Sequence, residues 1–109
     1  MNYFLIILDE DEYYCPSSSH YGEKSLSERI TKLVTSHCSP FKNTIIIRSD
    51  KDNKYWQEKV SELRTNKNKG FLVITIDIAN YKNLIGGSLV SGKWKWLDEE
   101  SKLNGKLKQ

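Results

Sequence analysis

The chain has 109 residues, of which 38% are hydrophobic and 28% are charged, and its formal net charge is +3. This length fits one domain with a small core, and the mild positive charge lacks the strong excess of dedicated nucleic-acid binders. No stretch approaches the roughly 20 apolar residues of a membrane-spanning helix. Residues 3–8 are apolar but have no basic flank, unlike a signal peptide. We therefore expect a cytoplasmic protein with no membrane contact.

The first half of the chain predicts a strand, a long loop and a helix. Residues 3–8 are apolar on both faces, which indicates a central strand that ends at Asp9. Residues 10–24 have the composition of a loop. Ser25 and Glu28 form an S-x-x-E capping box that begins a helix. Its apolar face comprises Leu26, Ile30, Leu33 and Val34. We expect this helix to end near His37, because Pro40 disfavours helical backbone before it.

The second half predicts strands and helices in alternation. Three adjacent isoleucines favour a strand over residues 43–48. Asp52 or Asn53 can cap the next helix, whose apolar stripe comprises Trp56, Val60 and Leu63. Residues 71–78 predict a buried strand, residues 88–90 a short edge strand after a glycine bend, and residues 94–102 a short terminal helix.

This order of elements predicts an α/β domain, an α+β sandwich in which a small ferredoxin-like sheet carries two helices on one face. A short C-terminal helix with Trp94 and Trp96 completes it. The domain spans residues 1–103, and residues 104–109 form a frayed basic tail. The opposite sheet face is rich in isoleucine and valine and must be covered. Either the tryptophan segment or a second subunit would cover it, so we expect a homodimer.

The chain also resembles the small SinR-like proteins, which are similar to the smaller subunit of the CRISPR adaptation complex and to the antitoxin ribonuclease GhoS. The first strand ending in Asp9, the helix over residues 26–34 and the strand over residues 71–78 carry this resemblance. Gly87, Leu89 and the box of Trp94, Trp96 and Leu97 are its most specific part. Such relatives have a strand hairpin between the two helices. Here we expect the first strand of that hairpin to be very short or absent.

Asp9 is the candidate catalytic and metal-binding residue. In the CRISPR-type relatives, an acidic residue that ends the first strand can hold a divalent cation with its symmetry mate across a dimer axis. The resemblance therefore implies that Asp9 binds Mg²⁺, which carboxylate oxygens suit, and the acidic residues 10–12 could supplement it. The alternative is that Asp9 only ends the strand and residues 10–12 form a solvated loop.

Two histidines and several lysines are the other candidates. His20, in the tyrosine-rich loop, is a candidate catalytic base, whereas His37 suits a structural place in the last turn of a helix. Lysines beside aromatic residues suit a nucleic-acid backbone. The candidates for that contact are Lys67, Lys69, Lys93 and Lys95. The alternative is that the tryptophans pack and the lysines keep the chain soluble. Cys15 and Cys38 have no metal-ligand spacing and are typical of reduced thiols, although the sequence leaves a disulfide open.

Two functions follow from these patterns. The resemblance implies a small nucleic-acid-associated protein, with or without metal-dependent endonuclease activity on RNA or DNA. The alternative is a non-catalytic protein-binding module, such as an antitoxin, an immunity protein or a phage-encoded inhibitor. No residue pattern fixes a nucleophile beside a base, which slightly favours binding over catalysis.

Overall fold

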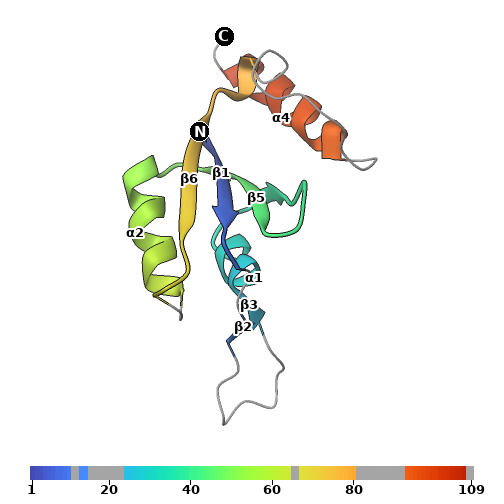
Figure 1. The fold of residues 1–109 in the computed structure, drawn as a ribbon. Coiled ribbons are helices and arrows are strands. Elements are labelled where there is room, and N and C mark those ends of the chain that lie inside the picture. The colour runs from blue at the N-terminus through green and yellow to red at the C-terminus, as the bar shows by residue number, and fades with distance from the viewer. Residues whose placement is uncertain (11–12, 15–23, 65–66, 81–92, 108–109) are drawn as a thin grey trace.

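A four-stranded antiparallel sheet organises the computed structural model, which describes residues 1–10, 13–14, 24–64, 67–80 and 93–107 (Figure 1). Its strands, in spatial order, are β4 (Ser36–Cys38), β5 (Thr44–Ser49), β1 (Asn2–Leu8) and β6 (Phe71–Ile76). Every neighbouring pair is antiparallel. The central place of β1 and the α+β, ferredoxin-like arrangement confirm the predicted fold class.

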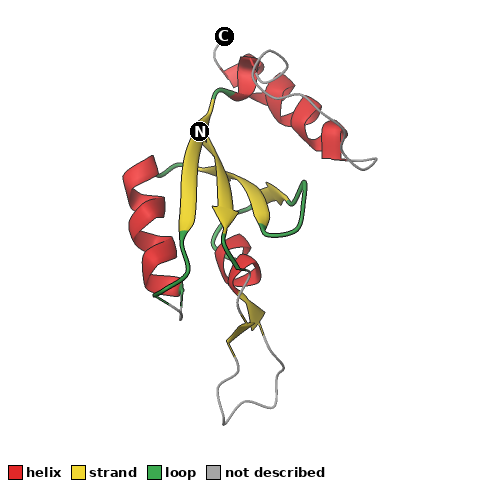
Figure 2. Ribbon diagram, viewed as in Figure 1, coloured by secondary structure: helices red, strands yellow, loops and turns green. Residues whose placement is uncertain are grey.

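Two helices cover one face of this sheet, as the sequence predicted (Figure 2). Helix α1 (Leu26–Thr31) begins after Ser25, whose hydroxyl accepts a hydrogen bond from the Glu28 backbone N–H at 3.2 Å. Helix α2 (Asn53–Leu63) begins after Asp52, whose carboxylate accepts from the Tyr55 N–H at 2.8 Å. Each cap satisfies a backbone donor that the first turn leaves without a partner.

The main core lies between these helices and the sheet. Alternate residues of β1 and β5 point toward the helices, as the two-residue period of a strand requires. The buried core side chains on this face are Phe4, Ile6, Leu8, Leu26, Ile30, Ile45, Ile47, Trp56 and Val60. Most of them were expected in apolar strands or on helix stripes.

The opposite face is covered only in part, by helix α4 (Lys93–Leu107). Leu97 of α4 is fully buried there, and Trp96 packs against the same cluster. A short 3₁₀ turn, η1 (Ile78–Asn80), contributes the buried Ile78. Of the two covers that the sequence left open for this face, the tryptophan segment therefore supplies part through Trp96 and Leu97, while the Trp94 side chain lies outside the described residues.

Smaller elements complete the described chain. Strands β2 (Tyr13–Tyr14) and β3 (Lys24–Ser25) pair as a two-residue ladder at the base of the loop expected over residues 10–24. A tight turn links β4 to β5, and Asn43 has a positive φ of 64° in it, a conformation that asparagine tolerates better than most residues. Among the helices that the structure describes, none is long and apolar enough to cross a membrane.

Several predicted boundaries were wrong. Helix α1 ends at Thr31 and not near His37, because residues 36–38 pair with β5 instead. That pairing forms the three-residue strand β4, where the sequence left the first strand of the hairpin either very short or absent. Helix α4 continues to Leu107, five residues beyond the predicted end and into the segment expected to fray. The predicted strand over residues 88–90 lies outside the described residues.

The strand over residues 71–78 was also predicted incorrectly. It ends at Ile76 and forms an edge of the sheet. It is not buried, because Leu72 is 59% exposed and Ile74 is 43% exposed. Its apolar residues on both faces led to the prediction of a sheet covered on both sides, but α4 covers the second face at one end only.

Candidate functional site

The second face of the sheet changes character along β1. The strand pairings arrange its side chains in rows that run across the sheet. The row nearest the start of β1 contains Ile76, Tyr3, Arg48 and Ser36. The middle row contains Ile74, Leu5, Ile46 and Cys38. The last row contains Leu72, Ile7 and Thr44. Helix α4 covers the first row and also the β5 and β4 members of the middle row, where Ile46 and Cys38 are buried with Leu97, whereas Ile74 and Leu72 on β6 are exposed.

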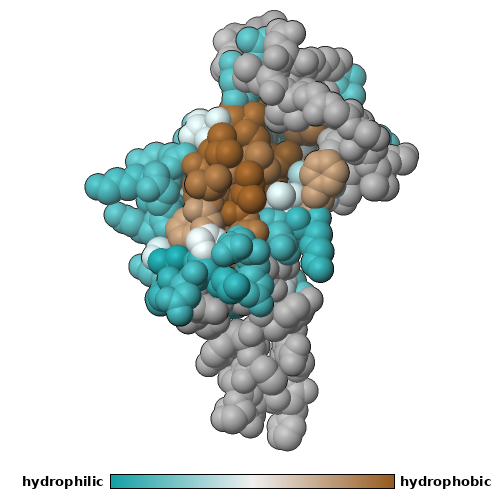
Figure 3. All heavy atoms as spheres, in the orientation of Figure 1, coloured by the Kyte–Doolittle hydropathy of each residue, from teal (hydrophilic) through white to brown (hydrophobic). Residues whose placement is uncertain are grey.

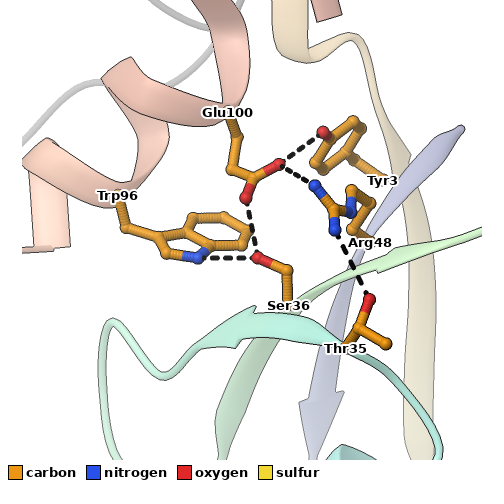
Figure 4. A network of polar contacts seen from close by, with 6 residues as sticks. All are labelled: Tyr3, Thr35, Ser36, Arg48, Trp96 and Glu100. Carbon is orange, nitrogen blue, oxygen red and sulfur yellow. Dashed lines mark hydrogen bonds and ion pairs between the residues drawn. The ribbon is translucent and has the colours of Figure 1, made fainter. Parts of the chain in front are cut away.

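A buried polar network fixes α4 over the first row (Figure 4). The Glu100 carboxylate accepts hydrogen bonds from the Tyr3 hydroxyl at 2.6 Å, from Ser36 Oγ at 2.7 Å and from Arg48 Nη1 at 3.2 Å. The indole N–H of Trp96 donates to Ser36 Oγ at 3.1 Å. Three donors therefore surround one carboxylate that is only 8% exposed as a residue, which offsets the cost of removing that charge from water.

This network is structural in character. The pKa of the Tyr3 hydroxyl is raised above its ordinary value, first because the group is buried and second because it donates a hydrogen bond to Glu100. A phenol that keeps its proton and donates a hydrogen bond to a carboxylate stabilises the docked helix. The Tyr3 ring also meets Trp96 edge to face, with ring centres 6.5 Å apart. The Glu100 carboxylate is thus engaged by Tyr3, Ser36 and Arg48, while the buried Nε of Arg48 has no hydrogen-bond partner among the described residues.

The uncovered parts of the last two rows form an aliphatic surface, which we call the apolar patch. It consists of Leu5, Ile7, Leu72 and Ile74, in which Leu5 stands opposite Ile74 and Ile7 opposite Leu72. The two residues of β6 are exposed and the two of β1 are half-buried. Figure 3 shows hydrophobic atoms gathered over β1 and β6, beside the hydrophilic surface of α2. Exposed aliphatic groups in one cluster are typical of interaction sites.

Asp9 lies where the sequence predicted, directly after β1, and its side chain has a structural contact. Its backbone N–H donates to the Gly70 carbonyl at 3.0 Å, and its carboxylate accepts from the Gly70 N–H at 3.4 Å. The neighbouring Glu10 pairs with Lys69 at 3.5 Å. Within the described residues, no group of three or more histidine, cysteine or acidic side chains could hold a metal. The predicted Mg²⁺ site at Asp9, shared between two subunits, therefore stays a prediction, and residues 11 and 12 lie outside the described residues.

Each of the three predicted lysines whose side chain the structure describes has a partner within the chain. Lys69 pairs with Glu10, and the Lys67 ammonium donates to the carbonyl of Ser61. Lys95 is exposed on α4 and lies 3.9 Å from Glu99. The side chain of Lys93 and the whole of His20 lie outside the described residues. His37 is exposed in β4 and not in a helix.

Two features were not singled out from the sequence. The apolar character of both faces of β1 and β6 indicated the apolar patch in the sequence. Nothing in the sequence indicated that the patch is exposed. Tyr55 of α2 lies between two ammonium groups, with Lys51 Nζ 5.6 Å and Lys59 Nζ 5.8 Å from its ring centre. Lys59 follows Tyr55 by four residues on α2, a helical spacing that the sequence contains, whereas Lys51 precedes the N-cap Asp52 and lies outside the helix. No protein-family model, curated protein or solved structure was found to match this chain.

Proposed function

We propose that this protein is a non-catalytic protein-binding module and that the apolar patch is its binding surface. The observation that carries the proposal is the exposure of Leu72 and Ile74, 59% and 43%, on a sheet face whose other end is covered by α4. Removing apolar surface from water contributes about 25 cal/mol per Å². Covering the patch with a partner would therefore contribute favourably to the free energy of binding.

The candidate catalytic groups in the described chain support binding over catalysis. Asp9 is held by Gly70, and Glu10 by Lys69. Glu100, the most buried carboxylate that the structure describes, is saturated by donors from the sheet. In the described chain each of these carboxylates therefore has a structural partner, which supports binding over catalysis.

The test is a pull-down of the tagged full chain from its native host, scored for bound protein, RNA and DNA. We expect one protein partner to be retained by the parent and lost from the Leu72→Lys, Ile74→Lys double variant. Both positions are exposed, so the fold should persist, and circular dichroism checks this. Leu33→Lys is the matched control, because Leu33 is 50% exposed and follows α1 on the other side of the sheet. Retention of nucleic acid alone, or of the same protein by the double variant, would contradict the proposal.

Nucleic-acid association is the second candidate, and the Tyr55 cluster is the observation that favours it. An aromatic ring flanked by Lys51 and Lys59 combines a stacking surface with charges for phosphate. Fluorescence anisotropy with labelled single-stranded RNA or DNA tests it. If this candidate is right, the Lys51→Gln, Lys59→Gln variant weakens binding and flattens its salt dependence. Equal affinity of parent and variant would remove the cluster from any such function.

The homodimer expected from the sequence remains a proposal. A second copy would bury exposed apolar side chains of a small domain, which gains most from added interface. Light scattering at tens of micromolar protein tests it, and a monomer mass at that concentration would contradict it.

A further inference from the structure

We infer that the partner which covers the apolar patch presents an amphipathic helix, in the same layer as α4. The inference rests on the proposed function and specifies the partner of that same surface. Three observations carry it: the dimensions of the patch, the way α4 already covers the adjoining row, and the charge at the open end of β1.

The dimensions of the patch fit one helix. Neighbouring strands lie about 4.8 Å apart, so a patch on β1 and β6 is roughly 10 Å wide, the diameter of a helix with its side chains. Its two rows are separated by two residues, or about 7 Å. The flat area is therefore roughly 70 Å², whereas a stable interface buries about 800 Å² on each partner. The patch alone is too small for a stable interface with any partner, so a helix that docks on it must continue onto neighbouring surface.

Helix α4 shows how this sheet face receives a helix. Its side chains at positions 96, 97 and 100 point onto the sheet, with Leu97 fully buried and Glu100 bound to the first row. The patch continues directly from that covered row, since Leu5 and Ile76 already pack against the buried cluster that contains Leu97 of α4. A partner helix with aliphatic residues at i, i+3 or i+4, and i+7 would extend the same layer, at the usual helix spacing of about 8–10 Å.

The open end of the patch carries the carboxylate of Asp9, next to the ion pair of Glu10 and Lys69. Asp9 follows Ile7 by two residues, and its carboxylate is exposed beside the last row. The aliphatic residues themselves carry no charge. We therefore expect the partner helix to carry lysine or arginine at one end of its apolar stripe, where it would meet Asp9 with a modest effect typical of exposed pairs.

The experiment uses the full chain and three synthetic 18-residue peptides of one Leu, Ala, Lys and Glu composition. One peptide has a helical apolar period, one alternates as a strand, and one is scrambled. We expect the helical peptide alone to bind with micromolar affinity in fluorescence anisotropy and to gain helical circular dichroism. Its affinity should fall at least tenfold for Leu72→Lys and stay unchanged for Leu33→Lys. Equal or tighter binding of the alternating or scrambled peptide would overturn the inference.

A photo-crosslinker at position 72 distinguishes this inference from the proposed function. In the native host, crosslinks to a helical, amphipathic segment of another protein support both. Crosslinks to an extended segment, or to a second copy of this chain, would overturn the helix inference. Crosslinks to a different protein through an extended segment would leave the protein-binding proposal standing, whereas crosslinks to nucleic acid alone would overturn both.

Discussion

The two ends of one sheet face differ, because helix α4 covers one end and leaves the other exposed. At the covered end, Tyr3, Ser36 and Arg48 offer three donors to the single carboxylate of Glu100 on α4. At the uncovered end, Leu72 and Ile74 offer only aliphatic surface. Hydrogen bonds are directional and fix one helix in one position, whereas the hydrophobic effect is not directional. The covered end therefore specifies its own helix, and the uncovered end can accept a partner from outside.

The largest expected effect compares two leucines on this face. Leu97 is fully buried and Leu72 is 59% exposed. We expect Leu97→Ala to lower the free energy of unfolding by about 2–5 kcal/mol, as buried leucine truncations do. Leu72→Ala should change it by less than about 0.5 kcal/mol. Urea denaturation measures both. Similar losses for the two variants would mean that the two ends do not differ in burial in solution.

The next effect isolates the polar network. Glu100→Gln keeps the size of the side chain but removes the charge that three donors share. We expect a loss of about 2–3 kcal/mol, because hydrogen bonds to charged groups contribute about 1.5–3 kcal/mol. Glu99→Gln is the matched control, since Glu99 is exposed and only 3.9 Å from Lys95. A Glu100→Gln protein as stable as the control would show that the network contributes little to the docking of α4.

A smaller effect concerns pH. The pKa of the Tyr3 hydroxyl is raised by burial and by Glu100, while tyrosine in an unfolded chain ionises near pH 10. Above about pH 10 the unfolded chain therefore binds fewer protons than the folded chain, and the parent loses stability as pH rises. Tyr3→Phe should cost about 1.5–2 kcal/mol at neutral pH, because it removes one hydrogen bond to a charged group, and its deficit should shrink between pH 9 and 11. A deficit that stays constant over this range would contradict the raised pKa.

The sequence predicted the elements that depend on neighbouring residues. The helix starts at Ser25 and Asp52 follow from side chains that bond within one turn, and the three isoleucines of β5 follow from local strand preference. The end of α1 does not follow from neighbouring residues in this way. Val34 packs against the core although it lies beyond the helix, while Leu33 is 50% exposed. The apolar period was read as helix throughout, but pairing with β5 determines the backbone there.

The candidate site was harder to predict for the same reason. The residues that bond Glu100 lie 97, 64 and 52 positions away in the chain. No local pattern in a sequence relates such positions. The apolar runs did indicate an uncovered sheet face, but only the position of α4 determines which rows of that face stay exposed.

The smallest effect on stability is expected at Asp9, at the uncovered end. Its carboxylate meets the Gly70 N–H at a long 3.4 Å, and an asparagine oxygen can accept the same bond, so Asp9→Asn should change stability by less than about 0.5 kcal/mol.

The effect of Asp9→Asn on activity differs between the two functions. The nuclease reading places Mg²⁺ between the Asp9 carboxylates of two subunits, so the variant should lose all Mg²⁺-dependent cleavage of RNA or DNA. The binding-module proposal expects no cleavage by parent or variant and equal retention of the protein partner. Cleavage that persists in Asp9→Asn, or in the presence of a chelator, would remove Asp9 from any mechanism and contradict the non-catalytic proposal as well.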